Sequence, residues 1–270
     1  MKTFINRLYG NYLMPSRLHL YEELLRNGAA AGYSQTSVRA FFRSIGEDDF
    51  FERRVIVHRH DVDSDIRTAR KIFAIEKVHG VHSTFYFRLS TLDFPFMREI
   101  EEYGSEASYH YEEIAAFAKK NNIRSAQDIT ANLSEIRSNF LHNFDYIQHE
   151  LGAKLSTVAS HGDFANRNLA MPNTEILNNS EVRKRCGIVC ESYDRELLDK
   201  FDIYISDRPH PEYFHPVSPL NALGYHRKLC ILTHPIQWET NWLENTKANA
   251  VRLHEELAWK LHRKFPGGDC

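Results

Sequence analysis

Acidic and imidazole side chains follow four separate apolar segments of this sequence, each at the point where the segment ends. The four junctions are RVIVHR before His60–Asp63, EASY before His110, LSTVA before Ser160–Asp163, and CIL before Thr233–Pro235. In α/β proteins with parallel strands, ligands and catalytic groups lie at the carboxyl ends of the strands. We therefore expect these four ends to form one shared site.

Two acids of the first junction, Asp61 and Asp63, are separated by one residue. Alternate side chains of an extended segment point to the same face, so the two carboxylates are expected side by side. Because like charges repel, a bound cation or a shared proton is a natural way to accommodate them. With a metal, one carboxylate ligates and the other stays free as a general base. Helix capping by Ser64 or Asp65 is the structural alternative, and it does not account for Asp61 and Asp63 together.

Two histidines are candidates for imidazole ligands of that metal. His110 stands at a strand end directly before a helix, with Glu112 and Glu113 close by. His161 lies in a turn that Gly162 permits, and it is predicted as a third metal ligand or a substrate contact. An isolated histidine is more often structural, but the strand-end position and the neighbouring acids favour a site for His110.

The last junction supplies a candidate general acid. His234 follows an apolar strand and is fixed by Pro235, with Trp238 close behind. An imidazole titrates near neutral pH and therefore suits proton transfer. Trp238 would offer an apolar wall on which a sugar ring could stack. A histidine hydrogen-bonded at the rim of the fold is the structural alternative.

The elements that must position these residues alternate along the chain. Short apolar runs alternate with longer amphipathic stretches, which predicts an α/β fold with a mostly parallel sheet. Strands are expected at 33–36, 54–59, 83–87, 106–109, 155–159, 187–190, 202–205 and 229–233. Helices are expected at 18–26, 38–42, 66–79, 96–103 and 241–264, with two more within 111–150. Gly28 is predicted to stop the first helix, Ser64 to cap the third, and 208–224 to form a long loop.

Composition limits the classes of function. The 270 residues are 42% hydrophobic and carry a formal net charge of -2, which gives no basic field for nucleic acid. No window approaches the ~20 apolar residues of a membrane span, and no signal peptide is evident, so the cytoplasm is the expected address. The four cysteines are interpreted as reduced thiols. With no repeat or linker, one domain over 1–270 is expected, in which 1–50 form the N-terminal helical and first-strand part.

The order of these motifs resembles the polysaccharide deacetylase superfamily (NodB homology, carbohydrate esterase family 4-like), in its branch with an HDVD signature. The matching pieces are HDVD at 60–63, GVHSTFYF at 80–87, HYE at 110–112 and HP at 234–235, over about residues 30 to 240. The resemblance implies a single distorted (β/α)7 barrel. It also implies one divalent metal held by one Asp and two His, an Asp base and a late His acid.

Residue roles follow from motif position. The resemblance implies Asp61 as base, Asp63 and His110 as metal ligands, and His234 as acid. Asp61 and Asp63 could exchange roles. The family's second metal His lies four residues after the first, where this chain has Ile114, and its Arg-Pro element is replaced by Ser160-His161-Gly162. His161 or Glu113 could replace the missing ligand.

The resemblance predicts a metal-dependent deacetylase that hydrolyses the N-acetyl amide of an acetamido sugar. The sugar would be nucleotide- or lipid-linked, as in O-antigen or capsule assembly, and the metal would be zinc, with nickel, cobalt or manganese as alternatives. Tyr111 and Trp238 are the expected substrate contacts. Two alternatives remain open: a catalytically impaired carbohydrate-binding relative, which Ile114 favours, and a hydrolase of another C–N bond. No nucleic-acid partner or membrane span is expected, and the sequence leaves the oligomeric state open.

Overall fold

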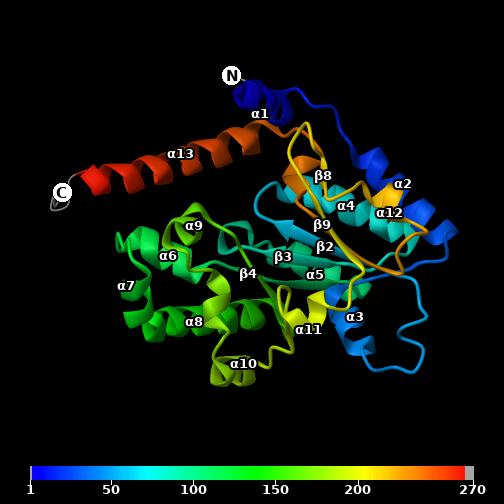
Figure 1. Cartoon of the computed structure of the whole chain (residues 1–270), viewed down its shortest axis with the longest axis horizontal. Helices are drawn as coiled ribbons and strands as arrows, with labels where there is room; N and C mark the ends of the chain where they lie inside the picture. Colours follow the sequence, from blue (N-terminus) through cyan, green and yellow to red (C-terminus); the bar gives the residue numbers. More distant parts are fainter. Residues whose placement is uncertain (1, 265–270) are drawn as a thin grey trace.

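A curled sheet forms the centre of the computed structural model, which describes residues 2–264 (Figure 1). Its strands run in the order β6-β5-β4-β3-β2-β9-β7-β8, and β1 pairs with β2. The bounds are β1 Ser34–Thr36, β2 Val55–Val62, β3 Thr84–Phe87, β4 Glu106–Tyr111, β5 Thr157–Ser160, β6 Cys190–Glu191, β7 Ile203–Asp207, β8 Phe214–His215 and β9 Lys228–Thr233. All pairs are parallel except β7 with β8.

The seven main parallel strands form an open barrel. Around the sheet, β2, β3, β4, β5 and β6 are successive neighbours, while β7 pairs with β9 and β9 returns to β2. Within the described residues β6 and β7 do not pair, so the ring has a seam between them. The predicted α/β class and distorted seven-stranded barrel are therefore confirmed.

Side chains alternate between the two faces of β2, as the pleat requires. Val55 and Val57 join an apolar cluster with Tyr86 of β3, Cys190 of β6 and Cys230 of β9. Because strands from opposite sides of the sheet contribute to it, this cluster fills the barrel interior. The next residues on the same face are Arg59 and Asp61, so the register of β2 directs both into the barrel.

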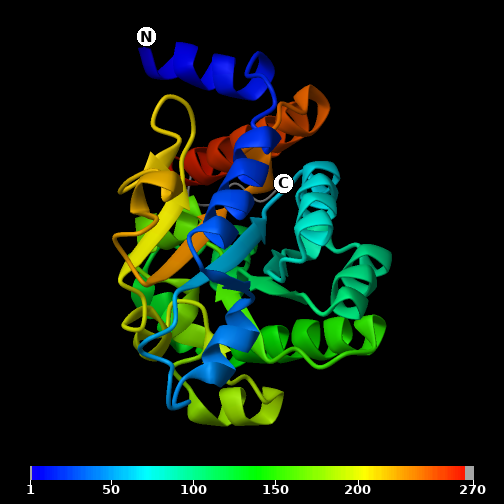
Figure 2. The same ribbon diagram turned by 90° about the vertical axis from the view of Figure 1, so that its right-hand side faces the viewer.

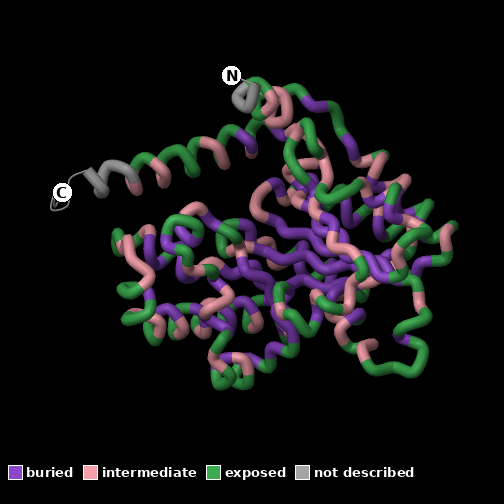
Figure 3. The backbone as a smooth tube through the Cα atoms, in the orientation of Figure 1, coloured by how far each residue is buried: buried purple, intermediate pink, exposed green. Residues whose placement is uncertain are grey.

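Helices cover the outer face of the sheet and its two ends (Figure 2). The bounds are α1 Lys2–Tyr12, α2 Leu18–Ala30, α3 Val38–Ser44, α4 Ile66–His79, α5 Phe94–Tyr103, α6 Glu113–Lys120, α7 Ala126–Ala131, α8 Leu133–Leu151, α9 Phe164–Leu169, α10 Ser180–Cys186, α11 Arg195–Leu198, α12 Pro219–Ala222 and α13 Trp242–Lys264. Burial is concentrated in the sheet and the inward sides of α2, α4, α5 and α8 (Figure 3). Residues 1 and 265–270 of the predicted 1–270 domain lie outside the described part.

Several predicted boundaries move, and each move has a physical reason. Helix α2 continues through Gly28 to Ala30, so this glycine does not end the helix. It lies where the helix packs closely on the sheet, since a Cβ there would be 2.9 Å from Cδ1 of Ile56. Asp65, and not Ser64, caps α4 by accepting a hydrogen bond from the amide of Thr68.

Three other expectations change in extent. Strands β2 and β4 run to Val62 and Tyr111, so Asp61 and His110 lie inside the last residues of their strands. Residues 111–150 form three helices instead of two, and the predicted loop 208–224 contains β8 and α12. Helix α4 ends as predicted, with Gly80 in the left-handed region at φ 66°.

His60, the first residue of the HDVD motif, points to the outer face of the sheet. Its Nε2 lies 2.8 Å from Oε1 of Glu76 on α4, and Tyr21 on α2 donates to the same oxygen at 2.6 Å. Ser83 donates to the other carboxylate oxygen at 2.7 Å. All four side chains are buried, so this network joins α2 and α4 to the sheet.

We expect His60→Ala to lower the free energy of unfolding by about 3 kcal/mol, because it leaves the buried Glu76 carboxylate without its imidazole partner. Urea denaturation measures this. The control, His79→Ala, removes a partly exposed partner of Glu22 and should cost less than about 1 kcal/mol. Equal losses in the two variants would contradict a structural role for His60.

Candidate metal centre

The carboxyl ends of β2, β4 and β5 bring the predicted ligands together. Asp63 follows β2, His110 is near the end of β4, and His161 follows β5. One ligand atom from each of these three residues lies within 4.8 Å of the others. The spacing can hold a metal ion, as the strand-end argument required.

The ring of His110 is oriented by the neighbouring strand. Its Nδ1 lies 2.9 Å from the carbonyl oxygen of Ala159, to which it donates. The other nitrogen, Nε2, therefore points to the carboxylates, 3.2 Å from Oδ1 of Asp63 and 3.4 Å from Oδ2 of Asp61. A carbonyl acceptor on the outer nitrogen is the usual way in which proteins orient a metal-binding histidine.

His161, which follows β5, faces the same carboxylate of Asp63. Its Nδ1 lies 3.3 Å from Oε2 of Glu112, and its Nε2 lies 3.6 Å from Oδ1 of Asp63. The rings of His110 and His161 are nearly perpendicular, with centroids 5.2 Å apart. Both imidazoles thus direct Nε2 at one carboxylate oxygen. The carbonyl of Ala159 accepts from Nδ1 of His110, whereas Nδ1 of His161 faces Glu112 without a well-aligned hydrogen bond.

The donor set fits a divalent cation. Oδ1 of Asp63 is buried and accepts no well-aligned hydrogen bond, so its lone pairs are available. Two imidazole nitrogens and one carboxylate oxygen, with a further position left open, make up the three-residue ligand set of catalytic zinc sites. The identity of the metal does not follow from this set.

A second group of possible ligands, Glu112, His161 and Asp163, fits a metal less well. Arg88 already binds Glu112, with Nη2 at 2.6 and 2.8 Å from the two carboxylate oxygens. Lys119 binds Asp163 at 3.0 Å. Both carboxylates are thus neutralised by cations, and of the two only Glu112 faces the ring of His161.

The negative charges of Asp61 and Asp63 favour a proton on a neighbouring imidazole or a bound cation. Burial disfavours ionised Asp63, but His161 and His110 outweigh it and hold the pKa of Asp63 well below its ordinary value. Burial likewise disfavours charged His110, but Asp61 and Asp63 outweigh it and raise the pKa of His110. The two carboxylates therefore stabilise the imidazolium form of His110.

Asp61 is held by Arg59 from the same strand. Arg59 donates from Nε and Nη2 to the two oxygens of Asp61, both at 2.8 Å, and both side chains are buried. Burial opposes ionisation, but Arg59 and then His110 outweigh it and lower the pKa of Asp61. Asp61 is therefore an ionised carboxylate beside the three ligands.

His234 is paired with Asp207 at the end of β7. Its Nδ1 lies 2.6 Å from Oδ1 of Asp207, whose Oδ2 accepts from the backbone amide of His234 and from Nε1 of Trp238. Burial alone lowers the pKa of His234, but Asp207 outweighs it and the pKa rises to about 10. His234 is thus an imidazolium at neutral pH. Its ring is oriented by Asp207, both of whose carboxylate oxygens accept hydrogen bonds.

The two predicted substrate contacts do not reach the site. Tyr111 is completely buried on the outer face, where it packs against Phe140 of α8. Trp238 is also buried and supports Asp207 instead of offering a wall. Both positions contradict direct contact with a ligand in this conformation.

The structure also separates the candidates for the missing ligand. Ile114, in the first turn of α6, is buried in the core, and Glu113 accepts hydrogen bonds from Tyr109 and Asn143 on the outer side of the sheet. Of the two suggested replacements, only His161 lies with Asp63 and His110.

Sequence reasoning missed Arg59, Asp207 and Tyr193. Arg59 could have been found, because the alternation that pairs Asp61 with Asp63 places Arg59 on the same face. Asp207 is another strand-end acid, and it was missed because the predicted strand stopped at residue 205. Tyr193 follows the two-residue strand β6, which gave no comparable signal.

A cavity of about 490 Å³ opens beside His161. Its wall is formed by the residues after β5, the segment around α9 and Tyr193: Ser160, His161, Gly162, Asp163, Asn166, Arg167, Ala170, Met171, Pro172, Asn173, Thr174 and Tyr193. Tyr193 is partly exposed, and its hydroxyl lies 3.1 Å from Nη2 of Arg59. The cavity therefore touches a candidate ligand and a residue in contact with the Arg59–Asp61 pair.

We expect His161→Ala to weaken zinc binding by more than about 100-fold, since loss of a ligand should exceed the effect of losing an outer hydrogen-bond partner. Zinc binding by the unmodified chain should release protons at pH values below the raised pKa of His110, because the protonated ring must lose its proton to ligate. The affinity should accordingly rise with pH. Calorimetry in two buffers of different ionisation enthalpy measures both quantities.

His79→Ala is the matched control, because it removes an imidazole with an acid partner away from the cluster. Its zinc affinity should equal that of the unmodified chain. Unchanged affinity in His161→Ala, or binding without proton release, would contradict the assigned ligand set.

Comparison with known proteins gives a distant structural likeness. No family model matches the chain, and no curated protein sequence matches it. A solved structure of a mutant of a CE4 family pseudoenzyme, with restored enzymatic activity, superposes with a TM-score of 0.42 at 14% sequence identity. The likeness covers 75% of this chain and 64% of that chain, which is less than two thirds of its length. No helix among residues 2–264 is both long and apolar enough to cross a membrane.

Proposed function

We propose that this chain is a metal-dependent deacetylase that hydrolyses the N-acetyl amide of an acetamido sugar. The observation that carries the proposal is the convergence of two imidazole Nε2 atoms on Oδ1 of Asp63, beside a cavity. Asp63, His110 and His161 would hold one divalent cation, zinc first among the candidates. Such an ion supplies Lewis acidity to an amide carbonyl and lowers the pKa of water.

Asp61 is the proposed base. Its Oδ2 lies 3.4 Å from Nε2 of His110, so a proton acceptor stands next to the ligands. The lowered pKa of Asp61 keeps it ionised at neutral pH and ready to accept a proton from the attacking water. Arg59 fixes the direction of this carboxylate.

His234 is the proposed acid for the departing amine. An amine leaves an amide readily only after it has been protonated, and the raised pKa keeps a proton on His234 at neutral pH. Asp207 fixes the Nδ1 side of the ring, so Nε2 is the nitrogen free to donate.

The cavity supports a sugar substrate. It combines an aromatic ring, Tyr193, with polar side chains such as Thr174, and a pyranose offers both an apolar face and hydroxyl groups. Arg167 is exposed at the cavity and suits the phosphate of a nucleotide or lipid carrier. We extend the proposal to a carrier-linked acetamido sugar used in surface polysaccharide assembly.

A carbohydrate-binding protein with impaired catalysis is the second candidate. The Arg59–Asp61 pair favours it, because both oxygens of Asp61 accept from Arg59 and a lowered pKa makes a carboxylate a weaker base. Ile114 no longer favours it, because His161 stands with the other two ligands. The two candidates predict equal sugar binding and different turnover.

We expect zinc-loaded protein to release free amine from a carrier-linked acetamido sugar, measured by amine labelling across a panel of sugar nucleotides and glycolipids. Asp61→Asn and His234→Ala should each lower kcat by at least about 100-fold without loss of zinc. Saturation-transfer NMR on the same panel detects binding without turnover. Binding to a sugar by a zinc-loaded chain that releases no amine would establish the second candidate.

We expect Asp207→Asn to lower the pKa of His234 below about 10, because the carboxylate that stabilises the imidazolium is replaced by a neutral amide. The alkaline limb of the pH–rate profile should move to lower pH by the same amount. NMR titration of the His234 ring gives the pKa independently of activity. An unchanged His234 pKa would refute this electrostatic role of Asp207.

A further inference from the structure

The backbone of His161 begins the segment that leads from β5 to the 3-10 helix η2 (Asn173–Ile176). In the described structure this segment contains the short helix α9 and no strand. The amide of His161 donates to the carbonyl oxygen of Tyr111, on β4, at 2.8 Å. The sheet therefore holds the amide side of this candidate ligand, and a different contact holds its carbonyl side.

That second contact comes from the side chain of Asn173. Its Nδ2 donates to the carbonyl oxygen of His161 at 2.6 Å. Asn173 is 1% exposed, so its side chain is shielded from water and the bond is strengthened by the low local dielectric. Both backbone polar groups of His161 are therefore fixed, one by the sheet and the other by Asn173.

The other end of the same carboxamide binds helix α6. Oδ1 of Asn173 accepts from the amide of Ile114 at 3.0 Å and from that of Ala115 at 3.3 Å. Amides in the first turn of a helix have no partner within the helix, so a side-chain acceptor satisfies them there. Because α6 follows closely on β4, which carries His110, one side chain joins the segments that supply two of the three ligands.

Asn166 fixes the direction of this carboxamide. Its Oδ1 accepts from Nδ2 of Asn173 at 3.1 Å, and its own Nδ2 donates to the carbonyl oxygen of Met171 at 2.8 Å. Asn173 therefore uses both donor positions on Nδ2 and both acceptor positions on Oδ1. A reversed carboxamide would set its donors against the amides of α6, so only one orientation satisfies all four contacts.

The ring of His161 has less support of its own than the ring of His110. Nδ1 of His110 donates to the carbonyl of Ala159, whereas Nδ1 of His161 faces Glu112 without a well-aligned hydrogen bond. The place of the His161 imidazole therefore depends more strongly on how its backbone is held.

We propose that Asn173 is the positioning residue for His161: its side chain holds the backbone so that Nε2 of His161 faces Oδ1 of Asp63. A cation then meets ligands that are already in place, and binding does not have to order the segment after β5. The inference rests on the metal site of the proposed function and uses no step of its reaction.

The first test is calorimetric titration of the full chain with zinc alone. Asn173→Asp keeps an acceptor for the amides of α6, where a carboxylate is favourable, but it sets an oxygen against the carbonyl of His161. We expect the zinc affinity to fall at least about 10-fold, as when a group that orients a ligand is lost. Asn173→Ala removes the contacts without adding charge and should also weaken binding. Circular dichroism checks the fold of both variants, so the result does not depend on one of them.

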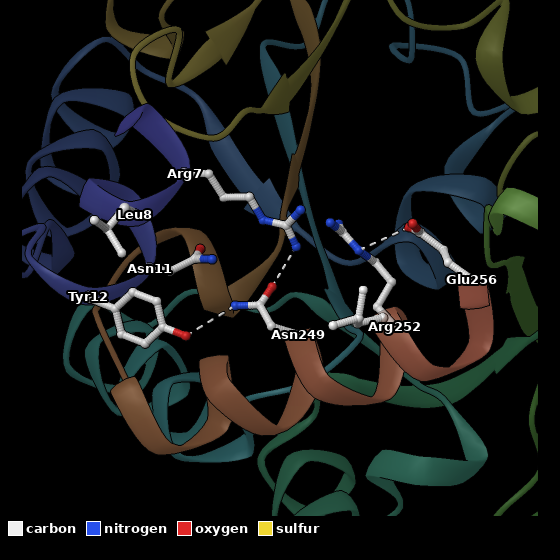
Figure 4. A pocket seen from close by; sticks show the side chains of 8 residues that line it. Arg7, Leu8, Asn11, Tyr12, Asn249, Arg252 and Glu256 are labelled. Carbon is white, nitrogen blue, oxygen red and sulfur yellow. Dashed lines mark hydrogen bonds and ion pairs between the residues drawn. The ribbon is translucent and has the colours of Figure 1, made fainter. Parts of the chain in front are cut away.

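Asn245→Asp is the matched control. Asn245 is also 1% exposed, and its Nδ2 donates to the backbone carbonyl of Asn11, which lines the groove between α1 and α13 (Figure 4). The eight described residues that line this groove include no candidate metal ligand. The zinc affinity of Asn245→Asp should therefore equal that of the unmodified chain.

A double-mutant cycle separates positioning from a general loss of structure. If Asn173 acts through His161, Asn173→Asp should have no further effect on zinc affinity in a chain that already carries His161→Ala. Hydrogen exchange of the His161 amide gives a readout without metal. It should be at least about 10-fold faster in Asn173→Asp than in Asn245→Asp, because the segment opens more readily when its carbonyl contact is lost.

Unchanged zinc affinity in Asn173→Asp, in a chain that binds zinc, would overturn the positioning role and leave the metal site intact. An equal further loss in the His161→Ala background would also overturn it, since a general loss of structure would then explain the effect. A chain that binds no zinc, but in which Asn173→Asp speeds exchange of the His161 amide, would refute the proposed function and support the positioning role.

Discussion

The buried Arg59–Asp61 pair is the interaction on which the barrel and its site both depend. Both charges are removed from water, so each must be compensated where it lies. Arg59 donates to both oxygens of Asp61 and also reaches the hydroxyls of Tyr193, after β6, and Tyr204, on β7. Its guanidinium therefore contacts a residue that follows β6 and a residue of β7, the two strands that border the seam.

This arrangement links the opening of the barrel to its chemistry. Arg59 links the side chains of Tyr193, after β6, and Tyr204, on β7, the two strands that do not pair. The same bridge leaves Asp61 ionised next to His110 and Asp63. Removing one member would leave an unpaired buried charge, a loss of about 3–5 kcal/mol in stability.

The strand-end rule located Asp61, Asp63, His110, His161 and His234, because polar residues that end buried strands are visible in a sequence. The rule does not tell which face of the strand a side chain points to. Tyr111 neighbours His110 and must point the opposite way, and His60 stands in the same relation to Asp61. Applying the alternation to every residue of each motif would have corrected the assignment of Tyr111 as a substrate contact.

Other features depend on contacts between distant segments and could not be predicted locally. The seam reflects missing pairing between two strands, and Gly28 is retained because Ile56 packs against it from another element. The role of Trp238 follows from its distance to Asp207, 31 residues away in the chain.

The central claim is that the ends of β2, β4 and β5 form one divalent metal site. Anomalous diffraction at the zinc absorption edge, from crystals grown with zinc, tests it most directly. The account predicts one strong peak per chain, within coordination distance of Oδ1 of Asp63 and of Nε2 of both His110 and His161. A map without that peak, or with zinc held by Glu112 and Asp163 instead, would contradict it.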